Sequence, residues 1–328
     1  MEIIKTKLDK NVPIDKYLIN KNPCFLDIET TGFNRSKDII YLIGILSFDN
    51  KETSWILEQI FINKIEKEKE LLLETIKVLS KFNVIINYNG DTFDIPFINQ
   101  RLKIHNINNS IPIEKSLDIY SNIRKNRYLF DLENLKLKTI EKFLGIHRED
   151  IYSGKDCIQF YNDYLTNKDK KLKNKILQHN HDDLYYLLRV IKILDIIEMK
   201  KTFTIKMDTE DLSFLINDIK QLNDYIIING EIKGNIENKT LFYKNNYKIL
   251  ISDNNLFEVS VEIKEGLVTP TKNCLFLNKH EFHIPDNIIW ESDYNIPSNI
   301  ILFKVENNFI ISNIKSFISF LINKTLNN

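Results

Sequence analysis

Residues 24–32 read Cys-Phe-Leu-Asp-Ile-Glu-Thr-Thr-Gly, and the rest of the chain is best understood outward from this stretch. Its apolar residues predict a buried strand, and the threonines and glycine that follow predict a turn. Side chains alternate between the two faces of a strand, so Asp27 and Glu29 share one face. Two carboxylates this close repel each other, which requires raised pKa values or a cation between them. A solvated strand end is the alternative interpretation.

The segments around this strand predict an α/β domain. Strand-like apolar runs occupy 39–48, 54–62, 83–88 and 116–120, and helical spacing occupies 64–82 and 94–104. The order is three strands, a helix, a strand, a helix and a strand. It resembles the order of an RNase H-like fold, a mixed sheet with flanking helices.

The pattern changes in the last third of the chain. Helical spacing continues to about residue 200, after which apolar and polar residues alternate between Asn, Gly and Asp turns. This alternation predicts a smaller, mainly antiparallel β domain with a closing helix at 313–323. A length of 328 residues suits two domains. We predict an RNase H-like domain at 1–203 and a β-rich accessory domain at 204–328, either gripping substrate or purely structural.

Composition excludes several classes of protein. The 45 basic and 45 acidic residues cancel, so a bound polyanion must be held by local basic groups and metal. The three cysteines lack CxxC spacing, which argues against a disulfide framework or a zinc knuckle. No apolar run approaches the roughly 18 residues of a membrane span, and the N-terminus lacks a signal-peptide pattern. We expect a cytoplasmic protein that does not bind membranes.

A second acidic segment, Asn-Gly-Asp-Thr-Phe-Asp at 89–94, follows a predicted strand. It places Asp94 at the start of a helix whose first turn tolerates Pro96. Aspartate is also favoured there as a helix cap, so Asp94 is either a cap or part of a site. Asn89 equally fits a tight turn, and Phe93 equally fits core packing.

A third segment, His-Asn-His-Asp-Asp at 179–183, begins a long helical pattern. Asp183 shares a face with the apolar residues that follow, so we expect Asp183 to point toward the core and Asp182 toward solvent. A buried carboxylate needs a partner. His179 lies one turn earlier, at the spacing that puts both side chains over one place. A structural His–Asp hydrogen bond is the alternative, and His181 is a rival.

Together the three segments supply four carboxylates: Asp27, Glu29, Asp94 and Asp183. Oxygen ligands from separate segments suit two hard divalent cations with room for water and phosphate. The absence of thiolate clusters favours Mg²⁺ or Mn²⁺ over zinc.

The wording and spacing of these segments resemble the DEDD (DnaQ-like) superfamily of 3′-5′ exonucleases. In that superfamily an acidic strand pair, an Asn-x-x-x-Phe-Asp segment and a terminal acidic helix build the site. Within it, residues 116–127, 135–156 and 177–194 resemble the YprB-type RNase H-like family. The resemblance covers roughly residues 20–200 of the chain.

The resemblance implies a role for each site residue. Asp27 would bridge both cations, Glu29 and Asp183 would complete one site, and Asp94 would hold the second ion directly or through water. His179 would orient and deprotonate the attacking water. The spacing from His179 to Asp183 is that of the subgroup using tyrosine, whereas the residue is that of the histidine subgroup. The residue five positions before Asp183 is a glutamine, which cannot act as a base.

The resemblance further implies a two-metal, 3′-5′ exonuclease that converts single-stranded or frayed ends of DNA or RNA to nucleoside monophosphates. Six residues are expected to contact the substrate: Thr30, Thr31, Gly32, Phe33, Asn89 and Phe93. Among them, Phe33 stands beyond a glycine and before a polar loop, which suits stacking on an unpaired base.

Two alternatives stay open at this point. RNase H-like shells also host structure-specific endonucleases and can serve as non-catalytic nucleic-acid-binding modules. The presence of all four carboxylates argues against the non-catalytic module, because a decayed site would have lost one of them.

Overall fold

The computed structural model describes residues 1–8, 21–148, 152–206, 211–234 and 240–326. The chain divides into two compact units, each with its own hydrophobic core. Unit 1 comprises Met1–Lys125 and Leu132–Leu194, and unit 2 comprises Asn126–Asp131 and Asp195–Asn328. The domain boundary placed between residues 203 and 204 from sequence stays a prediction.

Unit 1 is built on one mixed sheet. Its strands are β1 (Glu2–Lys7), β2 (Pro23–Thr30), β3 (Ile40–Asp49), β4 (Ser54–Phe61), β5 (Val84–Asn87) and β6 (Ser116–Asp118). They lie in the order β1-β4-β3-β2-β5-β6, antiparallel from β1 to β2 and parallel from β2 to β6. The predicted mixed sheet is confirmed. The edge strand β1 was not predicted, because its sequence is short and polar.

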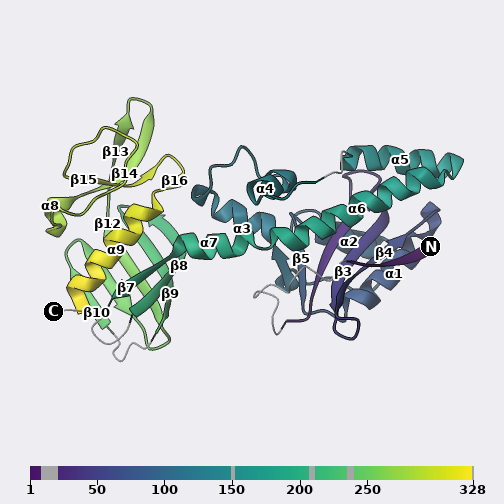
Figure 1. Ribbon diagram of the computed structural model, residues 1–328, viewed down its shortest axis with the longest axis horizontal. Coiled ribbons are helices and arrows are strands. Elements are labelled where there is room, and N and C mark those ends of the chain that lie inside the picture. Colours follow the sequence, from purple (N-terminus) through teal and green to yellow (C-terminus); the bar gives the residue numbers. More distant parts are fainter. Residues whose placement is uncertain (9–20, 149–151, 207–210, 235–239, 327–328) are drawn as a thin grey trace. The chain divides into compact units, whose positions relative to one another are not determined.

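Helices cover this sheet on its faces. They are α1 (Glu68–Leu79), α2 (Asp94–Ile104), α3 (Ile119–Lys125), α4 (Leu137–Phe143), α5 (Gly154–Asn167) and α6 (Lys170–Val190). α1 packs on β3 and β4, whereas α6 lies over β2 and β3 with α5 beside it (Figure 1). The strand predicted at 116–120 ends at Asp118, where α3 begins.

The central position of β2 explains why its end can carry a buried site. β2 pairs with β3 on one side and β5 on the other, so its apolar residues Leu26 and Ile28 are covered. The register with β3 shifts between Glu29 and Thr30, and Thr30 is the last residue of β2 that pairs with β3. Asp27 and Glu29 therefore lie near the end of the paired segment, on a strand that α6 covers.

Unit 2 is mainly antiparallel β, as predicted. One sheet has the order β10-β11-β12-β9-β8-β7 and a second the order β13-β14-β15-β16. The strands are β7 (Thr202–Lys206), β8 (Asp211–Leu222), β9 (Tyr225–Lys233), β10 (Thr240–Lys244), β11 (Tyr247–Ile251), β12 (Leu256–Glu262), β13 (Lys264–Thr269), β14 (Lys272–Asn278), β15 (Ile300–Val305) and β16 (Asn308–Phe309). Its helices are α7 (Ile193–Lys201), α8 (Lys279–Phe282) and α9 (Ile311–Leu326), the predicted closing helix.

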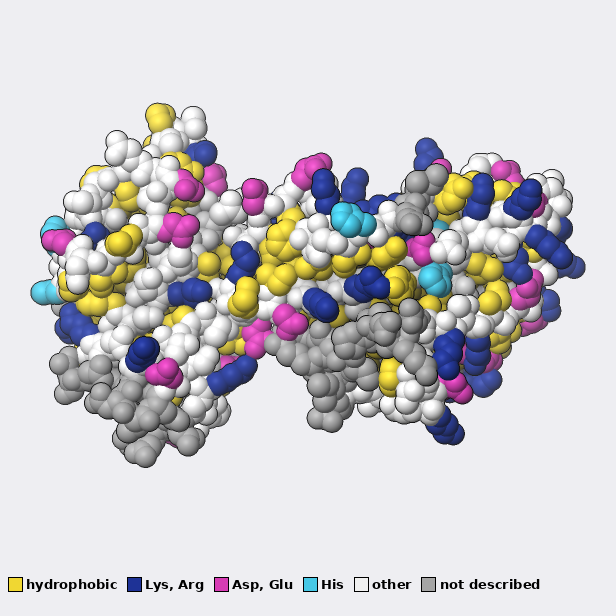
Figure 2. Space-filling view, viewed as in Figure 1, with side chains coloured by type: hydrophobic (Ala, Val, Ile, Leu, Met, Phe, Trp, Pro, Cys, Tyr) yellow, Lys and Arg dark blue, Asp and Glu magenta, His cyan; other side chains and the backbone are white. Residues whose placement is uncertain are grey.

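The surface agrees with the neutral composition. Figure 2 shows basic and acidic side chains interspersed on the visible face of unit 1. All three cysteines are buried and none forms a disulfide. Within the described ranges, every helix is too short or too polar to cross a bilayer.

A buried ion pair fastens α1 and α2 to the start of β3. The Glu68 carboxylate accepts hydrogen bonds from Arg101 Nε at 2.9 Å and Nη2 at 2.5 Å, and from the Ile40 amide at 2.9 Å. His105 Nε2 lies 2.7 Å from the same carboxylate. Glu68 and Arg101 are 1% and 6% exposed. Because each charge is withdrawn from water, each depends on the other.

We predict that Arg101→Ala lowers the free energy of unfolding by about 3–5 kcal/mol, because it leaves the Glu68 carboxylate buried without its main partner. Urea denaturation measures the loss. The double variant Glu68→Gln with Arg101→Met should recover much of it. Lys77→Ala, which removes an exposed pair with Glu74 on α1, is the control and should cost at most about 1 kcal/mol. An equal loss in Arg101→Ala and the control would contradict the assignment.

Candidate active site

The four predicted carboxylates converge from three elements. Asp27 and Glu29 come from β2, Asp94 is the first residue of α2, and Asp183 lies on α6. The pKa of Asp27 is raised well above its usual value, first by burial and then by repulsion from Asp183, Glu29 and Asp94. The carboxylates of Asp183, Glu29 and Asp94 therefore all lie close enough to Asp27 to repel its charge.

Asp94 is not the helix cap. The cap position is Phe93, and the Asp94 carboxylate instead accepts a hydrogen bond from the Ile28 amide of β2 at 3.2 Å. Burial raises the pKa of Asp94 to about 7, backbone hydrogen bonds oppose the rise, and repulsion from Asp118 and Asp183 adds to it. Helix capping therefore does not explain why an aspartate occupies this position.

His179 lies between two of the carboxylates. Its Nε2 atom is 3.8 Å from Glu29 Oε1 and 3.8 Å from Asp183 Oδ2, and the residue is 6% exposed. His181 points elsewhere: its Nδ1 atom lies 2.9 Å from Asp182 Oδ1, and its ring stacks on Tyr185. The structure thus brings His179, and not His181, to the acidic cluster.

The expected orientation of Asp182 toward solvent is wrong. Its side chain is 13% exposed, against 23% for Asp183, because Gln178 donates to it at 2.7 Å and His181 covers it. Asp183 does face the cluster, but at its more open side. There it accepts a hydrogen bond from Arg148, a residue that no sequence pattern singled out.

Local hydrogen bonds occupy polar groups of the turn after β2. The Thr30 hydroxyl donates to the Gly32 carbonyl at 2.7 Å. The Thr31 amide donates to the Ile39 carbonyl and the Thr31 hydroxyl accepts from the Ile39 amide, both at 3.0 Å. A Cβ at Gly32 would lie 2.5 Å from Asp38 Oδ2, so a larger residue there would displace the Asp38 carboxylate. The Thr31 amide is therefore not available to a substrate in this conformation.

Two aromatic rings flank the cluster. Phe33 is 81% exposed, and its ring meets that of Phe93 edge-on with 6.1 Å between centroids. Phe93 is partly buried and packs against the core of unit 1. Asn89 has a φ of 65° and its side-chain oxygen accepts from the Thr92 hydroxyl at 2.7 Å. Among the predicted substrate-contacting residues, Phe33 offers the most open surface.

Asp118, at the end of β6, is a residue that sequence reasoning missed. It is 3% exposed and accepts from the amides of Asn89 at 2.9 Å, Ser121 at 3.2 Å and Asp91 at 3.3 Å. It thereby holds the loop that opens α2 and positions Asp94. Its position could have indicated it, because Asp118 is an acidic residue at the end of a strand that pairs in parallel with β5.

A cysteine also borders the site. Ligand atoms of Glu29, Cys157 and His179 all lie within 4.8 Å of one another. Cys157 is fully buried, as expected for a small apolar side chain.

The donor set fits divalent cations. Carboxylate oxygens are the preferred ligands of Mg²⁺ and Mn²⁺, and a cation would offset both the burial and the repulsion of these acids. Asp27, Glu29, Asp94 and Asp183 are the residues that would hold it.

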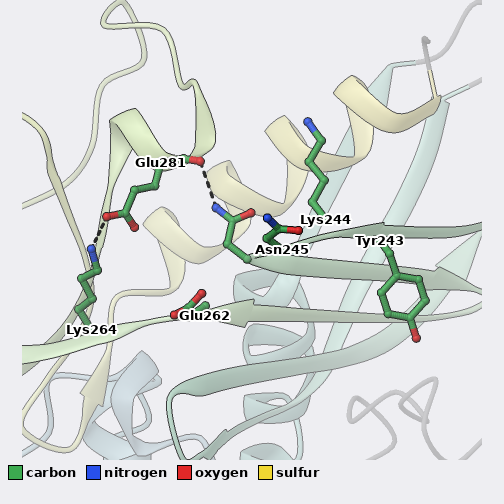
Figure 3. A pocket seen from close by; sticks show the side chains of 7 residues that line it. Tyr243, Lys244, Asn245, Glu262, Lys264 and Glu281 are labelled. Carbon is green, nitrogen blue, oxygen red and sulfur yellow. Dashed lines mark hydrogen bonds and ion pairs between the residues drawn. The ribbon is translucent and has the colours of Figure 1, made fainter.

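A separate hollow in unit 2 contains none of the predicted site residues. It lies beside the β10–β11 turn, and Figure 3 shows that its charged side chains partly satisfy one another. Lys264 pairs with Glu281, and Asn246 donates to the Glu281 carbonyl at 3.0 Å.

Comparison with known proteins agrees with the fold. The family model of the RNase_H superfamily matches residues 24–195, more than half of the chain. DNA polymerase 1 of Aeropyrum pernix is 26% identical over 89 residues, 27% of this chain and 8% of that protein. A DNA polymerase of Methanocaldococcus jannaschii is 44% identical over 46 residues, 14% of this chain and 3% of that protein. The chain thus spans less than a tenth of either relative.

Solved structures include more distant similarities. The family B DNA polymerase of Pyrobaculum calidifontis aligns with a TM-score of 0.43 at 14% identity, over 55% of this chain and 25% of that one. A structure described as an ExoI/SSB-Ct complex aligns with a TM-score of 0.30 at 14% identity, over 64% of this chain and 55% of that one. The family match confirms the RNase H-like fold predicted for the first part of the chain.

The raised pKa of Asp94 predicts how stability depends on pH without metal. The folded protein binds this proton more tightly than the unfolded chain, so stability falls as pH rises from about 4 to about 7. Asp94→Asn stays neutral and lacks that fall. In EDTA its Tm should exceed that of the wild type increasingly toward pH 8, by about 2–4 °C for each kcal/mol gained. Exposed Asp286→Asn is the control; parallel curves for both variants would contradict the prediction.

Proposed function

This chain belongs to the RNase H superfamily, and from that premise we propose that it is a divalent-metal-dependent 3′-5′ exonuclease of the DEDD type. The substrate is a single-stranded or frayed end of DNA or RNA, cut to nucleoside monophosphates. The observation that carries the proposal is the convergence of four carboxylates, with the pKa values of Asp27 and Asp94 raised by burial. Such a cluster is costly without cations and suited to them.

In the proposed mechanism Asp27, Glu29, Asp94 and Asp183 would hold two divalent cations. Bound there, the cations would offset charge on the phosphodiester and polarise it. Water forms a bond to phosphorus and the P–O3′ bond breaks. A proton of the water passes to His179 Nε2, and the departing 3′ oxygen takes a proton from solvent to become the new 3′-hydroxyl. Glu29 and Asp183, each 3.8 Å from that atom, stabilise the resulting imidazolium.

The exposed ring of Phe33 supports the preference for unpaired ends. A base freed from a duplex can stack on an aromatic face, whereas a paired base cannot reach it without fraying. Thr30, Thr31, Gly32, Asn89 and Phe93 complete the proposed substrate surface. Thr30, Thr31 and Gly32 contribute through the shape of the turn that their hydrogen bonds maintain.

We predict that the wild-type protein releases mononucleotides from the 3′ end of labelled oligonucleotides with Mn²⁺ or Mg²⁺, and none in EDTA. Asp183→Ala should abolish this release, because it removes a proposed ligand. Asp182→Ala is the matched control on the same helix and should retain it. Comparing 3′-labelled with 5′-labelled strands gives the direction of digestion. Cleavage of a circular strand, which has no ends, would indicate an endonuclease. Tight binding without cleavage in every metal would contradict the proposal and favour a non-catalytic module.

For the proposed base we predict that His179→Ala lowers kcat by about 10²-fold or more, since general base catalysis typically contributes that much. His181→Ala, which removes a histidine two residues away that faces Asp182, should change kcat little. Single-turnover digestion with saturating Mn²⁺ measures both. A larger loss in His181→Ala than in His179→Ala would reverse the assignment.

A further inference from the structure

Three cross-strand partners underlie the acidic cluster. Asp27 of β2 lies opposite Gly44 of β3, and Gly44 lies opposite Gln59 of β4. Directly opposite residues project from the same face of a sheet, so this row faces one way. α6 covers that face and inserts the fully buried Asn180 into it.

Gly44 provides the space for Asn180. A Cβ at this position would lie 2.3 Å from Asn180 Oδ1 and 2.5 Å from Leu184 Cδ1. Real side chains do not approach that closely, so any larger residue would push Asn180 or the helix away. The requirement for glycine here is steric.

Two hydrogen bonds set the direction of the Asn180 amide. Gln59 Nε2 donates to Asn180 Oδ1 at 2.9 Å and to the Leu177 carbonyl at 2.8 Å. Asn180 Nδ2 in turn donates to Asp27 Oδ2 at 2.7 Å. Because the glutamine amide holds the oxygen of Asn180, the nitrogen of Asn180 must face the carboxylate. The Asn180 hydrogen bond also favours the ionised form and lowers the pKa of Asp27 against the effect of burial.

We infer that Gln59 and Asn180, admitted by Gly44, are positioning residues that hold the Asp27 carboxylate ready for a divalent cation. The inference deepens the proposed function and rests on its assignment of Asp27 as a ligand. Asn180 engages one carboxylate oxygen, Oδ2, and thereby fixes the rotation of the carboxylate group. Groups that orient a metal ligand in this way commonly contribute on the order of 10–100-fold to metal affinity.

The test measures Mn²⁺ affinity directly, by calorimetric titration at one fixed pH, so that it does not depend on nuclease activity. Asn180→Ala should weaken Mn²⁺ binding roughly 10-fold or more. Gln59→Met should weaken it less, because the Asn180 amide remains but can turn over. In the double variant, Gln59→Met should add nothing to the effect of Asn180→Ala, since Gln59 acts only through Asn180. If the two substitutions weaken Mn²⁺ binding additively, Gln59 does not act through Asn180 and the inference is overturned.

Gly44→Ala keeps every hydrogen-bonding group and should weaken Mn²⁺ binding as Asn180→Ala does. The control is Asn313→Ala in unit 2, which removes a comparably buried amide bonded to the Glu291 and Leu302 carbonyls. It should lower Tm without changing Mn²⁺ affinity. If Gly44→Ala does not fold, the double-variant comparison still decides the matter.

Unchanged Mn²⁺ affinity in folded Asn180→Ala would overturn the inference while leaving the proposed nuclease intact. A wild-type protein that binds Mn²⁺ but cleaves no oligonucleotide would instead overturn the proposed function alone. A wild-type protein that binds no Mn²⁺ would overturn both the proposed function and the inference.

Discussion

Repulsion among buried carboxylates is the constraint around which unit 1 is arranged. Burial and three neighbouring acids all raise the pKa of Asp27. Hydrogen-bond donors contact three of these acids: Asn180 donates to Asp27, the Ile28 amide to Asp94 and Arg148 to Asp183. These donors reduce the repulsion without removing it, as the raised pKa values show. The remaining repulsion supports the proposal that these acids bind a cation.

The sheet makes this concentration of charge possible. β2 lies between an antiparallel partner and a parallel one, and Asp94, which follows the loop after β5, accepts a hydrogen bond from the Ile28 amide near the end of β2. Asp118 holds the loop after β5 through the amides of Asn89 and Asp91, and the Glu68–Arg101 pair fixes the start of β3. Neither group is among the four proposed ligands. Both hold rigid the elements that carry those ligands, which a precise metal site requires.

Local periodicity was enough to predict the order of strands and helices and three acidic segments, because each depends on residues close in sequence. What could not be predicted depends on register between distant segments. Gln59 and Asn180 are 121 residues apart, and no local pattern marks either as part of the site. The orientation of Asp182 failed for a related reason: a helical face indicates average burial, whereas Gln178 and His181 cover this particular side chain.

We propose above that Asp27, Glu29, Asp94 and Asp183 together form a divalent-cation site. Anomalous diffraction from crystals soaked in Mn²⁺ tests it most directly, because the signal locates the ion without reference to activity. We expect density bounded by these four carboxylates, with Asp27 contacting every ion in the cluster. Mn²⁺ density confined to other carboxylates, with the Asp27 side chain unliganded at saturating metal, would contradict it.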